Sequence, residues 1–221
     1  MAAPRTANQR AFLSRAESLL RQAILDGHFL PGQRLIQEVL ADFIGTSRAP
    51  VREALKSLAS EGMITLVENT GAWVTSYTQA QCIEMYRVRE RLEPLLLELS
   101  LPYLTDEQMD RLEDLRVEID AADDVSTFIT LDREFHLASY AGHHEPFLHD
   151  TVERLWNNTQ HYRRRFVERQ TPTTRQRISA EHALLVDTIR RRDAEGAGAV
   201  LELHIRRTRH ALAEASELFD D

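Results

Sequence analysis

Four residues in the C-terminal part of the chain have the side chains and the spacing of a metal site: Asp132, His136, His182 and His204. Asp132 and His136 are four residues apart and would share one face of a helix, while His182 and His204 each stand among apolar residues. Imidazole nitrogens with one carboxylate suit Zn²⁺, Ni²⁺, Fe²⁺ or Mn²⁺. The alternative is that these are core histidines held by hydrogen bonds, which buried histidines more often are.

A second group of residues, nearer the N-terminus, has the character of a DNA-reading surface. Arg48 and Arg52 open a helical segment that follows Thr46 and Ser47. Arginines in the N-terminal half of a recognition helix can each donate two hydrogen bonds to guanine. The helix N-terminus, with Thr46 and Ser47, suits a phosphate. The alternative is a solvated helix face on which both arginines pair with neighbouring carboxylates, such as that of Glu53.

The elements around these arginines predict a winged helix-turn-helix. Apolar residues recur at helical spacing in residues 9–27, and two shorter helical segments end at Gly45 and Gly62. Two β-rich runs around Glu68-Asn-Thr-Gly then predict a hairpin. A tight glycine turn would join the two short helices, and the hairpin would form the wing.

The histidines fall in a segment with helical periodicity and no convincing strand, from Gln79 onward. The pattern predicts six helices, at 79–101, 106–121, 124–141, 145–169, 173–192 and 194–218. Short connections favour antiparallel neighbours in an all-helical bundle. We therefore expect a mainly α protein with two domains, residues 1–76 and 79–221, joined by a short linker at 75–79.

Composition fits this division. The net charge of −8 over 221 residues lies in the C-terminal part, since residues 1–78 hold 8 Lys and Arg against 7 Asp and Glu, and residues 79–221 hold 19 against 28. The single cysteine, Cys82, excludes an intramolecular disulfide and a cysteine-rich zinc site. No apolar run approaches the roughly 20 residues of a membrane span, and no signal peptide is evident, so we expect a cytoplasmic protein.

The N-terminal pattern resembles the DNA-binding domain of the GntR family over about residues 10–76. It reads PG, then LA, then G-x-SR-x-PVREAL, then L-x-x-EG. The resemblance implies that Arg48 and Arg52 contact bases or the DNA backbone, and that Gly71 at the wing tip contacts the minor groove. It also makes Arg34 a candidate phosphate contact, with Lys56 less certain. The chain departs from the family at Glu38, where a basic residue is usual.

The C-terminal pattern resembles the FCD effector domain of the FadR subfamily, and the count of six helices resembles its VanR-type branch. The resemblance rests on Asp132-x-x-x-His136, on His182 in Glu-His-x-x-Leu, and on His204. It implies that all four side chains bind one divalent metal ion, most commonly Zn²⁺, with Ni²⁺, Mn²⁺ or Fe²⁺ as alternatives.

Arginines on the first bundle helix could pair with the carboxylate of an effector bound at such a metal. Arg89 matches the family pattern Tyr-x-x-R-x-x-L-E best, and Asn157 and Gln160 are further pocket candidates. The alternative for Arg89 is an ion pair with Glu93, four residues on. The basic clusters 163–165 and 190–192 are expected on solvated faces.

These features favour a metabolite-responsive DNA-binding repressor of metabolic genes over two other functions. A homodimer is expected, since operators of such proteins are inverted repeats, and a small carboxylate would release it from DNA. The alternatives are a metal-dependent hydrolase, for which Glu181 is the one candidate general base beside the histidines, and a direct metal-ion sensor. We expect no enzymatic activity and no membrane partner.

Overall fold

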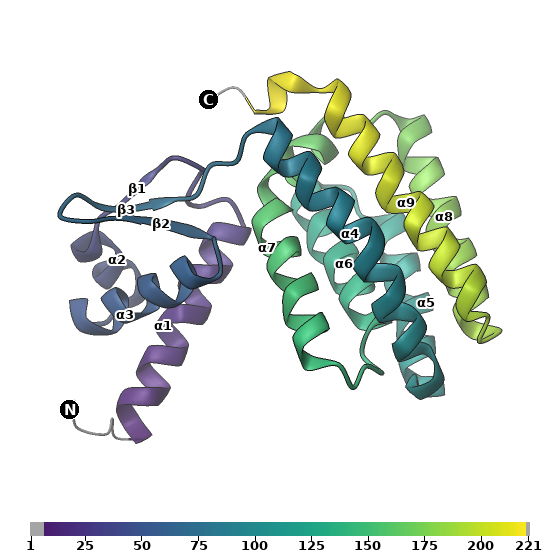
Figure 1. Cartoon of the computed structure of the whole chain (residues 1–221), viewed down its shortest axis with the longest axis horizontal. Coiled ribbons are helices and arrows are strands. Elements are labelled where there is room, and N and C mark those ends of the chain that lie inside the picture. The colour runs from purple at the N-terminus through teal and green to yellow at the C-terminus, as the bar shows by residue number, and fades with distance from the viewer. Residues whose placement is uncertain (1–6, 220–221) are drawn as a thin grey trace. The chain divides into compact units, whose positions relative to one another are not determined.

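The computed structural model describes the backbone of residues 7–219 and the side chains of residues 14–219. The chain divides into two compact units, Met1–Tyr77 and Thr78–Asp221 (Figure 1). Helices dominate, and the N-terminal unit adds a small sheet, which confirms the predicted mainly α fold. Among the described residues, no helix combines the length and the apolar character that crossing a bilayer requires.

The N-terminal unit has three helices before its hairpin, in the predicted order. The helices are α1 (Ala7–Leu25), α2 (Gln37–Ile44) and α3 (Arg48–Ser60). α2 ends at Gly45, whose φ of 73° is left-handed and whose N–H reaches carbonyls of the last turn. Because glycine adopts this conformation without a Cβ penalty, the chain turns sharply enough for α3 to begin three residues later.

A three-stranded antiparallel sheet completes this unit. Its strands are β1 (Arg34–Leu35), β2 (Ile64–Val67) and β3 (Gly71–Val74), in the order β1-β3-β2. Trp73 on the central strand pairs with Arg34 on one side and with Thr65 on the other. β2 and β3 are the predicted hairpin, whereas β1 was not predicted, because two residues are too few to display a period-2 pattern.

The core of the N-terminal unit fixes which face of α3 is exposed. Val51, Leu55 and Leu58 are fully buried in α3, and they pack into one cluster with buried residues of α1, α2 and the sheet. Arg48 and Arg52, in the first two turns of α3, lie outside this cluster, and both are exposed.

The C-terminal unit contains the six predicted helices with ends that differ by a few residues. They are α4 (Gln79–Ser100), α5 (Asp106–Ala121), α6 (Val125–Ser139), α7 (Pro146–Glu168), α8 (Pro172–Arg190) and α9 (Ala194–Glu214), with the short 3₁₀ turns Leu101–Tyr103 and Ser216–Leu218. Local sequence starts these helices. Thr78 and Thr105 form capping boxes with Gln81 and Gln108, and Asp124 caps α6.

The six helices close into a ring. α4 packs against α9, α9 against α8, α8 against α5, α5 against α6, α6 against α7, and α7 against α4 (Figure 1). Side chains that point inward from different helices therefore meet in one interior. Most of that interior is apolar, but it also holds a group of buried polar residues from α4, α6, α7, α8 and α9.

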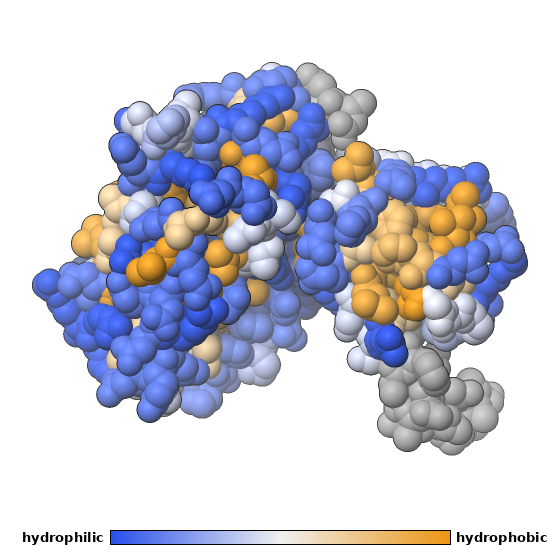
Figure 2. Space-filling view, turned by 180° about the vertical axis from the view of Figure 1, so that it is seen from behind, coloured by the Kyte–Doolittle hydropathy of each residue, from blue (hydrophilic) through white to orange (hydrophobic). Residues whose placement is uncertain are grey.

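The outer faces of this unit differ in character. On α4, Val88, Leu95 and Leu99 are each about two-fifths exposed, at spacings of seven and four that place them on one side of the helix. The side of the unit that faces the reader in Figure 2 is mostly hydrophilic, with scattered hydrophobic residues. An exposed apolar row on α4 thus contrasts with the side seen in that figure.

Candidate functional site

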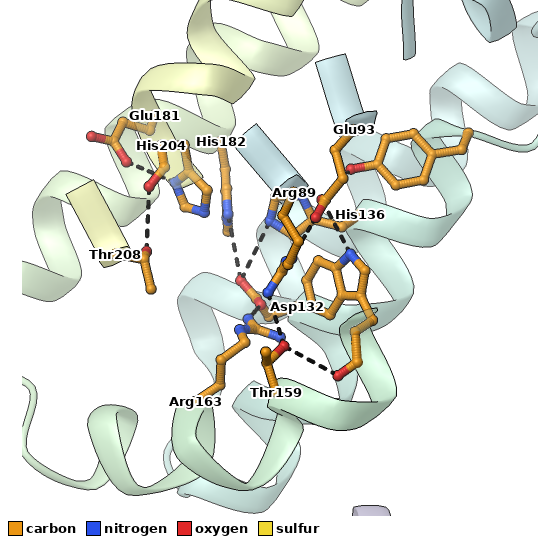
Figure 3. Close-up of polar contacts among 12 residues, drawn as sticks. Arg89, Glu93, Asp132, His136, Thr159, Arg163, Glu181, His182, His204 and Thr208 are labelled. Carbon is orange, nitrogen blue, oxygen red and sulfur yellow. Dashed lines mark hydrogen bonds and ion pairs between the residues drawn. The ribbon is translucent and has the colours of Figure 1, made fainter. Parts of the chain in front are cut away.

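Three histidines from three helices meet in the interior of the ring. His136 on α6, His182 on α8 and His204 on α9 each offer a nitrogen within 4.8 Å of the other two (Figure 3). Asp132, one turn before His136, places Oδ1 3.5 Å from Nε2 of His182 and 4.0 Å from Nε2 of His136. The fold therefore brings together all four predicted ligand residues, and all four are buried.

The hydrogen bonding of His136 and His182 does not fit the alternative of ordinary core histidines. Both nitrogens of His136 and both nitrogens of His182 are buried and have no hydrogen-bond partner among the described residues. Buried polar atoms nearly always have a partner, and each exception calls for an explanation. A metal ion ligated by the rings supplies one, and a set of three imidazoles and a carboxylate fits a borderline divalent ion.

Burial favours the neutral form of His136 and of His182, as metal ligation requires. Burial lowers the pKa of His182 to about 3, against the raising effect of Asp132. Burial, together with the neighbouring His204 and His182, holds the pKa of His136 well below its usual value. Neutral imidazoles have a lone pair to donate, so both rings are in the form that can ligate a cation at neutral pH.

Glu181 orients the third histidine. Its Oε2 lies 2.7 Å from Nδ1 of His204 and accepts a hydrogen bond of 2.6 Å from Nη2 of Arg207. When a carboxylate accepts the Nδ1 proton of a histidine, the lone pair is left on Nε2, which is the usual arrangement around metal-ligating histidines. Glu181 is thus engaged with His204 and Arg207, which argues against the general-base role considered for a hydrolase.

Glu181→Gln is therefore expected to weaken divalent metal binding by about tenfold. The amide can still accept the Nδ1 proton, but it is neutral and makes the ring a weaker donor. Competition titration of Zn²⁺ or Co²⁺ against a chromophoric chelator measures the affinity, and Glu217→Gln, an exposed ion-pair change near the C-terminus, is the control. An unchanged affinity in Glu181→Gln would show that Glu181 has no part in orienting the ligand.

Arg163 corrects the sequence prediction, which placed the cluster 163–165 on a solvated face. Its side chain is 9% exposed, and Nη2 donates to Oδ2 of Asp132. Its guanidinium carbon lies 4.2 Å from the ring centroid of Trp156. Burial alone would raise the pKa of Asp132, but the positive charge of Arg163 and the nearby histidines lower it overall. Asp132 is consequently an anion that is paired on one oxygen and faces the histidines with the other.

The second basic cluster, 190–192, is exposed, as the sequence predicted. Arg190 and Arg191 make exposed ion pairs with Asp110 and Asp187. Arg192 instead donates two hydrogen bonds of 2.9 Å, to the carbonyls of Leu101 and Leu104. It therefore ties the end of α8 to the connection after α4, which the sequence prediction did not include.

Arg89 makes the ion pair that the sequence left as an alternative. Its Nε donates to Glu93, its Nη1 donates to Thr159 Oγ1 at 3.1 Å, and its guanidinium stacks 4.2 Å from the centroid of Trp156. Glu93 also accepts hydrogen bonds from Tyr140 (2.8 Å) and Trp156 (3.1 Å). The Arg89–Glu93 pair is thus a fully bonded unit of the core, although Arg89 also lines the cavity beside the histidines.

The cavity beside the histidines is small. It is lined by residues from α4, α6, α7, α8 and α9, and the space open to the centre of a water molecule is about 20 Å³. That is room for about one water. Phe128 and Ile178 line both this cavity and an open groove of about 470 Å³ between α5, α6 and α8, so they form the wall between the two.

The remaining pocket candidates lie off this cavity. Asn157 does not line it, and its Oδ1 accepts a hydrogen bond of 2.6 Å from Arg133. Gln160 is buried on α7, and its Oε1 has no hydrogen-bond partner among the described residues. Asn157 as an effector ligand stays a prediction.

The predicted DNA-reading residues gather at the start of α3. Arg48 and Arg52 have side chains that are 64% and 61% exposed, and Ser47 occupies the N-cap position without a side-chain capping bond. Thr46 lies in the turn, where its N–H bonds to the carbonyl of Ala41 at 2.9 Å. The N-terminal end of α3 therefore presents two exposed guanidinium groups and the hydroxyl of Ser47, which makes no capping hydrogen bond.

Glu38, the departure noted in the sequence, lies across from this cluster. Its carboxylate on α2 pairs with Arg48, and both side chains are about two-thirds exposed. Arg52 has one carboxylate nearby, that of Glu53 at 3.8 Å, and Lys56 pairs with the same Glu53 at 3.1 Å. Arg48 is thus the more strongly engaged of the two arginines.

The wing residues are joined by Arg34. Gly71, with a φ of 144°, begins β3 at the tip of the hairpin. Arg34 Nη2 donates to the carbonyl of Thr70 at 3.0 Å, and its guanidinium lies over Trp73 with 5.7 Å between guanidinium carbon and ring centroid. Arg34 therefore braces the wing tip, a role that the sequence prediction of a phosphate contact did not include.

A winged helix-turn-helix followed by a helical ring with a buried histidine cluster is the architecture of a class of DNA-binding transcriptional regulators. The chain belongs to the GntR family of bacterial regulatory proteins and carries an FCD domain. The family model for "Bacterial regulatory proteins, gntR family" matches residues 13–74, and the FCD domain model matches residues 84–207.

Relatives with known names agree with this assignment. The chain is 28% identical to the HTH-type transcriptional regulator McbR of Escherichia coli, over 90% of this chain and 86% of McbR. The solved structure of E. coli McbR/YncC superposes with a TM-score of 0.83 and covers 92% of this chain and 97% of its own. The gluconate operon transcriptional repressor of Bacillus subtilis is 34% identical over 63% of this chain and 56% of the repressor. The chain is thus similar to transcriptional regulators along nearly its whole length.

Proposed function

We propose that this protein is a transcriptional repressor of metabolic genes, released from its operator by a small carboxylate effector that binds beside a divalent metal ion. The observation that carries the proposal is the buried group of unbonded histidine nitrogens around Asp132, in a chain whose other domain exposes two arginines at the start of a recognition helix. The C-terminal domain thus has side chains suited to binding a metal ion and an effector, and the N-terminal domain has side chains suited to binding DNA.

On the DNA side, Arg48 and Arg52 contact base edges or phosphates from the major groove, and Gly71 lets the wing approach the minor groove. Thr46, Ser47 and Arg34 add phosphate contacts. Major-groove binding by the start of a recognition helix is common to helix-turn-helix proteins, and their dimers read inverted repeats. The gluconate repressor similarity supports repression as the output.

The dimer that an inverted repeat requires is formed through the apolar row on α4, which consists of Val88, Leu95 and Leu99. These side chains are exposed on the described surface although each is large and apolar. Leu95→Glu is expected to convert the dimer to a monomer, because it would bury two carboxylates at a two-fold interface. Light scattering at micromolar concentration measures the mass. Val117→Glu, an equally exposed position on α5, is the control and should stay dimeric.

On the sensory side, Asp132, His136, His182 and His204 hold the ion, which supplies open coordination positions for a carboxylate when it is bound. Zn²⁺ is the ion we expect, with Ni²⁺, Mn²⁺ or Fe²⁺ as alternatives. The chain's own residues orient the ligands through Glu181 and exclude water through Phe128 and Ile178. Arg89 lines the cavity as a candidate effector contact, with its charge paired to Glu93. Binding shifts the equilibrium only if the effector favours the state with weak DNA affinity.

The test combines thermal shift with DNA release. Small carboxylates should raise the melting temperature of the Zn²⁺-loaded protein but not of protein kept in EDTA, and the carboxylate with the largest shift should release the protein from operator DNA in a gel-shift assay. A direct metal sensor, the second candidate, would lose regulation on metal removal with no organic ligand present. Carboxylate stabilisation that is equal with and without metal would overturn the proposal.

A further inference from the structure

The buried charges around the cavity balance in the absence of a metal ion. Two cations line it, Arg89 and Arg163, and each is paired with one buried anion, Glu93 and Asp132 respectively. The three histidines are neutral when they act as ligands. The two ion pairs therefore leave the interior with no net charge.

The two pairs respond differently to a metal ion. Glu93, on α4, accepts hydrogen bonds from Tyr140 and Trp156 as well as from Arg89. It is not one of the four proposed metal ligands. Asp132 is shared, because one oxygen pairs with Arg163 while the other faces His136 and His182. A divalent ion held at the histidines adds two positive charges, and no described anion in the cavity is left to balance them.

A buried excess of two positive charges is costly, since isolated charge in a poorly solvated interior is strongly disfavoured. Arg163 also has a donor ready for a new partner. Its Nη1 is buried and makes no hydrogen bond, and its stacking on Trp156 keeps the guanidinium in place if Asp132 turns toward a metal. The planar guanidinium fork matches a carboxylate.

We propose that the effector is a dianion, specifically a small dicarboxylate, with one charge neutralised against the metal ion and the other against Arg163. This inference rests on the metal site of the proposed function. It assigns the principal carboxylate-binding role to Arg163 rather than to Arg89, whose charge is already neutralised by Glu93. Because the cavity has room for about one water, a dicarboxylate must displace the wall formed by Phe128 and Ile178 toward the open groove.

The experiment compares malonate, acetate and the neutral malonamide as probes, by calorimetry on the full-length Co²⁺-loaded protein. We expect malonate to bind at least tenfold more tightly than acetate, malonamide not to bind, and none of them to bind in EDTA. The visible absorption spectrum of Co²⁺ reports independently that the metal is held and that its surroundings change with malonate.

Variants of Arg163 test whether its positive charge neutralises the second carboxylate of the effector. Arg163→Gln should bring the malonate and acetate affinities within threefold of each other, whereas Arg163→Lys, which keeps the charge, should retain the preference for malonate. Arg154→Gln, on the same helix but exposed, is the matched control. Arg163→Gln should melt at a lower temperature in EDTA, because Asp132 loses its partner, and should recover when Co²⁺ is added.

The outcomes separate the two proposals. If the wild-type protein does not bind Co²⁺, the proposed function fails and this inference fails with it. If Co²⁺ binds but malonate and acetate have equal affinities, the dianion is wrong while the metal site stands. If Arg163→Gln binds Co²⁺ and keeps the wild-type preference for malonate, Arg163 is not the second anchor.

Discussion

Replacing Arg52 with alanine is expected to abolish sequence-specific operator binding while leaving the protein folded. The side chain is 61% exposed, and the carboxylate near it is 3.8 Å away, so its removal should change the free energy of unfolding by no more than about 0.5 kcal/mol. A bidentate arginine–guanine contact contributes about 1–3 kcal/mol of discrimination. In a dimer that reads two half-sites the loss doubles to roughly 2–6 kcal/mol, which is a fall in specific affinity of 30-fold or more.

The measurement uses an operator selected from random duplexes by the wild-type protein, compared with a scrambled duplex in gel-shift titrations. Arg52→Ala should bind both duplexes with the same weak affinity. Lys56→Ala is the control, one turn further along α3 and paired with Glu53. It should weaken binding to both duplexes alike and lower the slope of log affinity against log salt by about one unit per subunit, or about two for the dimer. A variant at Arg52 that still prefers the selected operator would remove this residue from the reading surface.

The helices and the turn that expose Arg48 and Arg52 could be predicted because their sequence signals are local. The turn glycine, the buried face of Val51, Leu55 and Leu58, and the two arginines lie within one short stretch of chain, and each acts on its neighbours. β1 was missed because a two-residue strand has no pattern of its own. It forms only because Arg34 and Leu35 pair with Trp73 and Ala72, which are distant in the chain.

The grouping of Asp132 with the three histidines was also predictable, whereas the buried arginine that pairs with Asp132 was not. Arg163 was placed on the surface because of its residue type, but its partner Asp132 is 31 positions away in the chain. A signal did exist. Trp156, Gln160, Arg163 and Val167 recur at intervals of three and four on the buried face of α7. An arginine in register with Trp156 and Val167 on one helix face indicates a buried cation, which requires an anion opposite.

Glu38, in the DNA-binding domain, is a second residue whose ion-pair partner could not be predicted from the sequence. Its acidic character was visible as a departure from the family pattern, but its consequence depends on the packing of α2 against α3, which brings its carboxylate to Arg48. Exposed pairs of this kind contribute roughly 0–1 kcal/mol, so stability does not explain it. Its effect is to pair with Arg48, one of the two arginines proposed to read DNA, and to place a negative charge beside it.

Replacing Asp132 with asparagine is expected to destabilise the metal-free protein by about 3–5 kcal/mol, the cost of breaking a buried ion pair on one side. Asp132 and Arg163 are buried together, and the amide would leave the guanidinium charged with no anion beside it. Urea unfolding in EDTA measures the change. Asp187→Asn, which removes an exposed partner of Arg191 on α8, should cost less than about 1 kcal/mol.

The same variant separates the structural and the metal-binding roles of Asp132. Wild-type protein should gain stability with Zn²⁺ concentration, because an ion that binds only the folded state stabilises it by mass action. Asp132→Asn should lose most of that gain, since it lacks the one anionic ligand. Arg163→Gln breaks the same ion pair but keeps the carboxylate ligand. Adding Zn²⁺ should therefore restore the stability of Arg163→Gln but not that of Asp132→Asn. If Zn²⁺ rescued both variants equally, Asp132 would be a partner of Arg163 alone and the metal site would consist of the three histidines.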